Sequence, residues 1–188
     1  MRKIIVILTL VLSFTGLNAQ ESEIQTLFGS GTRISGFGGP TMSFTSINGE
    51  FAHMMGGGGG VLLGDFFIGG YGEGLTNSIT AGGNRIKLGH GGFWTGYSFM
   101  ASRALHPAVS TQMGWGSITQ TDDNHYHLSS DNVFVINPAI ELEMNFTRFF
   151  RIGAGAHYRF VSGVNTSTLT NADFSGPGAF LSFKFGWY

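Results

Sequence analysis

The sequence predicts an all-β chain that folds as an eight-stranded antiparallel up-and-down transmembrane β-barrel. Three observations lead to this prediction: extended runs in which apolar and polar residues alternate, connections of alternating length, and a scarcity of charge. Only 11% of the 188 residues are charged, whereas 31 are glycine and 18 are phenylalanine. A soluble domain carries about 25% charged residues. The chain is therefore poor in the side chains that keep a protein surface wetted, and its apolar content argues against disorder.

The clearest alternation lies in three runs, at 132–144, 149–161 and 177–187. Each run places bulky apolar side chains on one face and small or ionisable ones on the other. The ionisable residues of the second face are Glu141, Glu143, Arg151, His157, Arg159 and Lys184. We predict that the bulky face contacts lipid and that the second face fills a narrow lumen. Because an unpaired buried charge is costly, these six side chains are expected to form an ion-pair network. A polar path for protons or small solutes is the alternative.

Five further strands are predicted near 32–46, 50–63, 66–74, 85–99 and 107–117, which brings the total to eight. Asn48-Gly49 and Gly64-Asp65 predict tight hairpins. The longer connections, at 75–84, 118–131 and 162–175, fall at one end of the barrel, as external loops do in outer-membrane barrels. An even number of strands permits closure, which lipid requires because it cannot satisfy free backbone groups.

Aromatic residues near the predicted strand ends are expected to form girdles at the two membrane interfaces. They are Trp94, Tyr97, Trp115, Trp187 and Tyr188.

The first 19 residues predict export. Arg2-Lys3 is a short basic start, an apolar run follows from Ile4 to Phe14, and Ala19 precedes a cleavable bond. The run is too short to span a bilayer as a helix, and no later segment reaches 18 uninterrupted apolar residues. We therefore expect a signal peptide at 1–19, a single barrel domain at 20–188, and an outer-membrane location after export.

Two stretches, 137–153 and 155–163, resemble a family of uncharacterised small outer-membrane β-barrel proteins of Gram-negative bacteria. The ending Phe183–Tyr188 resembles the aromatic terminus that the outer-membrane assembly machinery recognises. The resemblance implies the barrel fold, contact with outer-membrane lipid, and recognition of the C-terminal strand by that machinery. It implies no agreed activity.

Two motifs suggest chemistry but have simpler interpretations. Five consecutive glycines, Gly56 to Gly60, are followed by Val61 and not by the Lys-Ser or Lys-Thr of a phosphate-binding loop. They predict a strand against a crowded interior or a sharp bend. The segment 121–127 has two Asp and two His in no known ligand spacing, which predicts a polar external loop. We expect neither a metal nor a cofactor.

One constellation points to catalysis. His127, Ser129 and Glu141 resemble the base, nucleophile and orienting residue of lipid A deacylase barrels. On the predicted strand, however, Ser129 and Glu141 lie roughly 25–30 Å apart along the barrel. We therefore predict no enzyme, with lipid A deacylase as a weaker alternative.

The predicted function is a structural or accessory role, including that of a subunit in a larger outer-membrane complex. The alternative is a barrel for binding or uptake of a small apolar ligand or a surface partner, recognised by the three longer loops. Expected partners are outer-membrane lipid, the assembly machinery and other outer-membrane proteins. The net charge of −1 gives no basic surface for nucleic acid.

Overall fold

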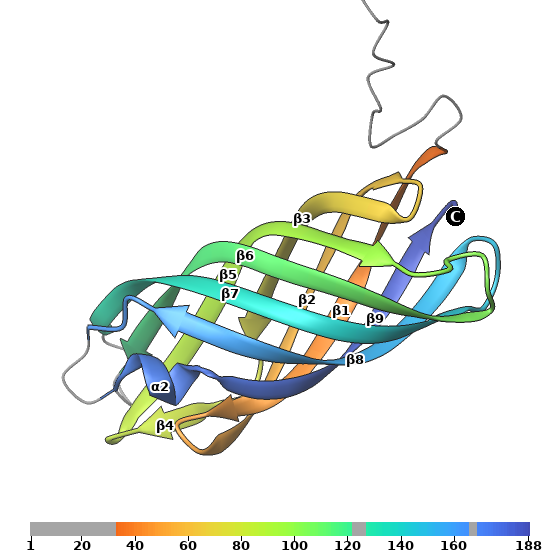
Figure 1. Ribbon diagram of the computed structural model, residues 1–188. Helices are drawn as coiled ribbons and strands as arrows, with labels where there is room; N and C mark the ends of the chain where they lie inside the picture. The colour runs from red at the N-terminus through yellow and green to blue at the C-terminus, as the bar shows by residue number, and fades with distance from the viewer. Residues whose placement is uncertain (1–32, 122–126, 166–168) are drawn as a thin grey trace, which may run out of the picture. The chain divides into compact units, whose positions relative to one another are not determined.

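The computed structural model describes residues 33–121, 127–165 and 169–188, which form a closed antiparallel barrel (Figure 1). The wall consists of eight long strands: β1 (Ile34–Ile47), β2 (Glu50–Leu63), β3 (Phe66–Leu75), β5 (Asn84–Ser98), β6 (Leu105–Thr121), β7 (His127–Asn145), β8 (Phe150–Ser162) and β9 (Gly176–Gly186). The predicted fold class is confirmed. The predicted signal peptide at 1–19 lies outside the described residues.

Two smaller elements lie in the connections. Strand β4 (Ile79–Ala81) pairs with β5, and helix α2 (Asn171–Phe174) lies between β8 and β9. Within the described ranges, no helix is long and apolar enough to cross a membrane.

The barrel closes because β1 pairs with β9 and β3 pairs with β5, as in the pairs Thr41–Ser182 and Gly70–Phe93. Each long strand therefore has two hydrogen-bonded neighbours, which removes the free edges of the sheet. The first described residue, Arg33, donates from Nη1 to the carbonyl oxygen of Tyr188 at 3.0 Å. We call this end of the barrel, which also has the turns 64–65, 99–104 and 146–149, the terminal end. The opposite end, with α2 and β4, is the loop end (Figure 1).

The predicted strands match the observed ones, but the predicted loops at 75–84, 118–131 and 162–175 are longer than the observed ones. Strand β4 and helix α2 occupy parts of the first and third, and β6 and β7 extend into the second. Gln120 pairs with Ser129, and Ile118 pairs with Asp131. Polar residues of this kind indicate turns, yet backbone pairing continues through them because the ladder does not depend on apolar side chains.

The side chains alternate between the lumen and the outside along every long strand. On β8, Arg151, His157 and Arg159 are buried inside, while Tyr158 and Phe160 are exposed outside. The predicted orientation of the last three runs is therefore confirmed. The outer surface carries exposed large apolar side chains on most strands: Val61, Ile68, Phe93, Val109, Met113, Trp115, Ile140, Leu142, Phe160, Leu181 and Phe185.

The predicted hairpin at Asn48-Gly49 is confirmed, and its geometry explains the residues. Asn48 has φ 50° and Gly49 has φ 78°, so both central residues adopt the left-handed region that a two-residue hairpin turn requires. Gly64 also has a positive φ, of 64°, in the second predicted hairpin.

The five-glycine run forms part of β2, and its inward glycines face a crowded lumen, as the structural interpretation predicted. A Cβ on Gly58 would lie 2.7 Å from the Gly70 carbonyl oxygen and 2.9 Å from Cε3 of Trp94. The missing side chain thus leaves the space that the Trp94 indole occupies.

Two predicted girdle residues are corrected by the structure. Trp94 points into the lumen and is 3% exposed, because residues an odd number apart on a strand, such as Trp94 and exposed Tyr97, face opposite sides. Tyr188 is partly buried and packs against an apolar cluster of the lumen, which consists of Phe37, Leu62, Phe67, Tyr71 and Trp94. Tyr97, Trp115 and Trp187 are exposed on the outer surface, and their place in an interfacial girdle stays a prediction.

Glycine tolerance should differ between the two faces of the wall. Gly58→Val is expected to lower the free energy of unfolding by about 1–3 kcal/mol through overpacking against Trp94. Gly72→Ala, on the outer face with nothing within 4 Å of the added Cβ, should be neutral or slightly stabilising. Urea titration of the barrel folded in lipid vesicles measures both. Equal losses in the two variants would contradict this packing.

Candidate functional site

An ion-pair network fills one side of the lumen near the terminal end. Lys184 Nζ lies 2.8 Å from Oε2 of Glu141 and also bonds Oε1 of Glu143. Arg151 Nη1 lies 2.9 Å from Oε2 of Glu143. All four residues are at most 5% exposed. We call them the lumen network; they are supplied by β7, β8 and β9 and contain two acids and two bases.

Three polar neighbours complete the bonding of the two glutamates. Ser98 donates to Oε2 of Glu143 at 3.0 Å, His106 Nε2 lies 2.8 Å from the same oxygen, and Ser182 bonds Glu141. Sequence reasoning missed these residues, because Ser98 and Ser182 are small and His106 precedes the predicted strand at 107–117. His106 lies two residues before the inward Ala108, and this spacing could have predicted that His106 also points into the lumen.

The other side of the lumen at this level is aromatic. Phe37, Phe67 and Trp94 pack edge to face, with ring centroids 5.2–5.6 Å apart. Lys184 Nζ lies 5.3 Å from the centroid of the Trp94 ring and 5.7 Å from that of Phe67. At this range the negative ring faces attract the ammonium group. Lys184 is thus held between two carboxylates and an aromatic wall.

A second polar group lies in the middle of the lumen and includes one residue of the predicted network. Glu73 Oε1 lies 3.2 Å from His90 Nε2, and the Tyr71 hydroxyl lies 3.1 Å from His90 Nδ1. His157 borders an internal cavity of about 20 Å³ shared with Glu73 and Asn137. That volume is close to the minimum for one water molecule.

Arg159 lies apart from Glu141 and Glu143, near the loop end, although it was predicted to join their network. Its Nε donates to the Phe174 carbonyl oxygen at 2.8 Å, and its Nη2 donates to that of Ser46 at 3.3 Å. Its Nη1 lies 2.9 Å from the sulfur of Met54. Backbone carbonyls from β1 and α2 therefore stabilise this fully buried guanidinium, and Arg159 ties α2 to the barrel.

An apolar cluster of described residues surrounds Arg159 and fills the lumen at the loop end. Phe174 of α2 is fully buried, and Leu169 beside it is 4% exposed. Both insert among aliphatic side chains of the wall: Ile47, Ala52, Met54, Ile79, Ala81, Ile86, Leu88, Ile118, Val133, Val135 and Val161. Among the described residues, the lumen is therefore filled with aliphatic, polar, and ionic or aromatic layers in turn.

The structure does not bring together Ser129 and Glu141 of the catalytic hypothesis. Both lie on the continuous strand β7, where Ser129 pairs with Gln120 and Glu141 pairs with Ala108. Twelve residues of strand correspond to about 40 Å. The side chain of His127 and residues 122–126 lie outside the described residues. Within the described part of the chain, no cluster of three or more metal-ligating His, Cys, Asp or Glu side chains occurs.

A second candidate surface lies on the outer wall, where neighbouring strands carry glycine at positions that face away from the lumen. Gly59 of β2 pairs with Gly38 and Gly70, Gly72 of β3 pairs with Gly57 and Gly91, and Gly74 pairs with Gly89. We call this contiguous set the outer glycine face: Gly38, Gly57, Gly59, Gly70, Gly72, Gly74, Gly89 and Gly91. Large exposed side chains border it, among them Val61, Ile68, Phe93 and Trp115.

The packing of the barrel does not account for most of this face. A Cβ added at Gly72 would meet nothing within 4 Å, and at Gly74 and Gly89 it would make only ordinary contacts, at 3.6 and 3.9 Å. Gly38 and Gly70 have similar room, at 3.5 and 3.4 Å. These outer glycines differ from Gly58, where the lumen leaves no space.

Solved structures with the same fold are small outer-membrane barrels. Neisserial surface protein A shares 14% identity with a TM-score of 0.63, covering 84% of this chain and 99% of that one. The N-terminal β-barrel domain of Pseudomonas aeruginosa OprF shares 17% identity with a TM-score of 0.55, covering 84% and 100%. Ail, the attachment invasion locus protein of Yersinia pestis, in complex with the heparin analogue sucrose octasulfate, shares 12% identity with a TM-score of 0.54, covering 82% and 97%.

No protein-family model and no curated protein matches the chain. The structural likeness therefore establishes the fold.

Removing the central cation should destabilise the barrel through uncompensated charge. Lys184→Met leaves Glu141 without its ion-pair partner and Glu143 with Arg151 and His106, and the free energy of unfolding should fall by about 3–5 kcal/mol. Urea titration in lipid vesicles, followed by tryptophan fluorescence, measures the loss.

Two further variants separate charge from packing. Arg85→Met, an exposed outward change near the loop end, should alter stability by less than about 0.5 kcal/mol. Lys184→Met combined with Glu141→Gln should lose less than Lys184→Met alone, because one buried negative charge is removed with the positive one. A double variant as unstable as the sum of its parts would contradict the electrostatic explanation.

Proposed function

We propose that this chain is a small accessory barrel of the Gram-negative outer membrane, which packs against another membrane protein through the outer glycine face. Two observations support the outer-membrane location: the exposed apolar side chains of the wall, and the outer-membrane origin of the similar structures. The single observation that carries the accessory role is glycine at outer positions where the barrel itself has room for a side chain.

Glycine is useful on a membrane-facing wall because it allows two backbones to approach closely. Between membrane proteins, association depends on van der Waals packing and interchain contacts, and interfaces are therefore enriched in small residues. An isolated barrel gains nothing from glycine at Gly72 or Gly74, since glycine weakens a strand interior by roughly 0.5–1 kcal/mol relative to alanine. A partner that packs over Gly72 and its neighbours would recover that loss.

The filled lumen favours a role on the wall or at the ends over uptake through the barrel. Eight strands leave space that side chains fill, and here the loop end holds Leu169, Phe174 and the aliphatic cluster. Transport of an apolar ligand through the lumen would require the removal of these side chains from their buried positions.

We infer that the terminal end faces the periplasm, because it has the short turns. Aromatic side chains cluster outside the wall at this end. Phe149 and Trp187 have ring centroids 5.5 Å apart, and those of Phe150 and Phe185 are 4.7 Å apart. Strand β9 would then present the C-terminal aromatic residues to the assembly machinery during insertion.

Site-specific cross-linking tests the interface directly, because the chain contains no cysteine. Gly72→Cys introduces one outward thiol in the centre of the outer glycine face. In native membranes, a short bifunctional cross-linker should join it to one discrete partner protein, seen as a single shifted band and identified by mass spectrometry.

The matched control is Ala156→Cys, an exposed outward position on β8, across the barrel from β3. It should give no such band. Gly72→Leu should abolish copurification of the same partner while leaving the heat-dependent gel mobility of the folded barrel unchanged. Equal cross-linking from Gly72 and Ala156, or none from either, would refute the proposed interface.

The proposed role is not enzymatic. Ser129→Ala is expected to leave the acyl pattern of lipid A unchanged in cells that express the variant in place of the native chain. Mass spectrometry of extracted lipid A measures this, with cells that lack the chain as the reference. A changed pattern in the variant would restore the deacylase hypothesis.

A further inference from the structure

We propose that the mouth of the lumen at the terminal end is a binding site for a phosphate-bearing anion. A cavity of about 550 Å³ opens there, a size within the range of small-molecule sites, roughly 300–1,000 Å³. Its floor contains the buried residues Leu62, Ser98 and Arg151, and the short turns of the terminal end form its rim. This site is separate from the outer glycine face and does not depend on it.

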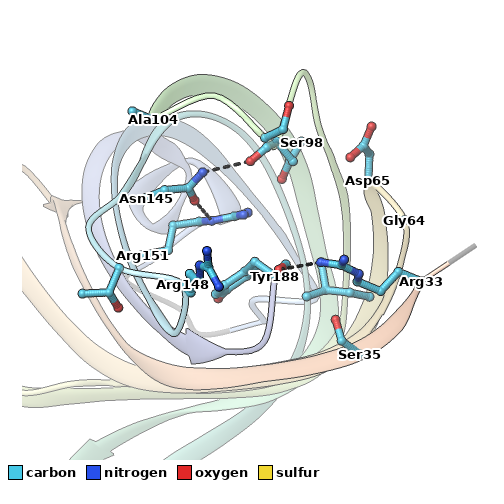
Figure 2. Close-up of a pocket in the computed structure, with 14 residues that line it drawn as sticks. Arg33, Ser35, Gly64, Asp65, Ser98, Ala104, Asn145, Arg148, Arg151 and Tyr188 are labelled. Carbon is cyan, nitrogen blue, oxygen red and sulfur yellow. Dashed lines mark hydrogen bonds between the residues drawn. The ribbon is translucent and has the colours of Figure 1, made fainter.

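Three arginines from different parts of the fold line this cavity (Figure 2). Arg33 precedes β1, Arg148 lies in the turn between β7 and β8, and Arg151 lies on β8. Figure 2 shows Arg148 and Arg151 on one side of Tyr188 and Arg33 on the other. Asp65 is the one acidic residue among those that line the cavity. Because Glu143 balances Arg151, the remaining charged side chains of the mouth are two arginines and one aspartate, a net excess of one positive charge.

These guanidinium groups retain donors that the described residues do not use. Arg151 donates from Nε to Oδ1 of Asn145 at 2.7 Å and from Nη1 to Oε2 of Glu143. Its Nη2 has no acceptor among the described residues. Arg33 donates one bond, to the Tyr188 carbonyl. Arg148 is exposed and has no hydrogen bond or ion pair within the described part of the chain. An anion would meet donors from three directions.

Tyr188 contributes to the same site. Its ring lies under the Arg151 guanidinium, whose central carbon is 3.8 Å from the ring centroid, and this contact holds Arg151 in place. Burial raises the pKa of the Tyr188 phenol, so the hydroxyl stays protonated and adds no negative charge beside Arg151. The hydroxyl oxygen itself is buried, so Tyr188 acts by holding Arg151 in place and not as a donor to the anion.

This donor arrangement fits a phosphate group. Guanidinium groups bind phosphate through paired, charge-assisted hydrogen bonds, and a tetrahedral anion can accept such pairs from several arginines at once. Two sources of the same chemistry reach this mouth: the headgroup of an anionic phospholipid in the adjacent leaflet, and a soluble phosphate. The small side chains of Ala101, Ser102 and Ala104 leave the rim open to either.

Calorimetric titration of the full-length folded barrel in an uncharged detergent tests the site. Inorganic phosphate is titrated in one arm and phosphatidylglycerol in the other, with diacylglycerol as the lipid that lacks a phosphate. We expect saturable binding in at least one arm. Arg148→Gln should weaken it about tenfold, and Arg33→Gln combined with Arg148→Gln should weaken it further. Binding of phosphate alone indicates a soluble ligand, and binding of phosphatidylglycerol alone indicates a lipid ligand.

The matched control is Arg103→Gln, in the turn 99–104, which supplies Ala101, Ser102 and Ala104 to the rim although Arg103 itself does not line the cavity. It should leave the affinity unchanged, and all variants should keep the heat-dependent gel mobility of the folded barrel. Absence of binding in both arms, equal binding of diacylglycerol, or an equal loss in Arg103→Gln would overturn the proposal.

Discussion

The burial of Lys184 between two glutamates is the interaction on which the terminal half of the lumen depends. A closed wall of eight strands leaves little internal volume, so the inward side chains of β7, β8 and β9 must compensate one another's charge inside it. Lys184 reaches both Glu141 and Glu143, and Arg151 balances the second acid. The ammonium group also lies against the Trp94 ring. The network therefore joins the polar side of the lumen to its aromatic side, and it fixes the orientation of the Arg151 guanidinium at the terminal mouth.

Glycine has two opposite uses in this wall. On the inner face, its lack of a side chain makes room for large rings, as Gly58 does for Trp94. On the outer face, Gly72 and Gly74 leave the backbone bare although side chains would fit. The same residue type thus permits dense packing inside and close approach from outside. Only the position of each glycine relative to its buried neighbours distinguishes the two uses.

Much of the fold could be read from the sequence, and the successes and errors have physical causes. Where a strand carries charged residues, as β8 does with Arg151 and Arg159, the cost of exposing charge to lipid fixes which face is inward. Strand β5 has no charged residue near Trp94 that would identify the inward face. Trp94 was therefore predicted to face outward, although it lies in the lumen. The ends of β6 and β7 were missed because polar residues signal turns while the backbone ladder continues. The partners within the lumen depend on pairing across five strands, β5 to β9, which local spacing does not encode. His157 and Arg159 accordingly lie apart from Glu141 and Glu143, the acids they were expected to meet.

The closure of the loop end by Leu169, Phe174 and the aliphatic cluster has a directional consequence. A molecule that enters the mouth beside Arg148 meets the aromatic cluster and the lumen network. The aliphatic cluster around Phe174 lies beyond them, toward the loop end. Among the described residues, packed side chains fill the lumen between the mouth at the terminal end and the loop end. On the proposed placement in the membrane, a ligand bound at this mouth would enter and leave from the same side, so its occupancy would follow the ligand concentration on that side alone.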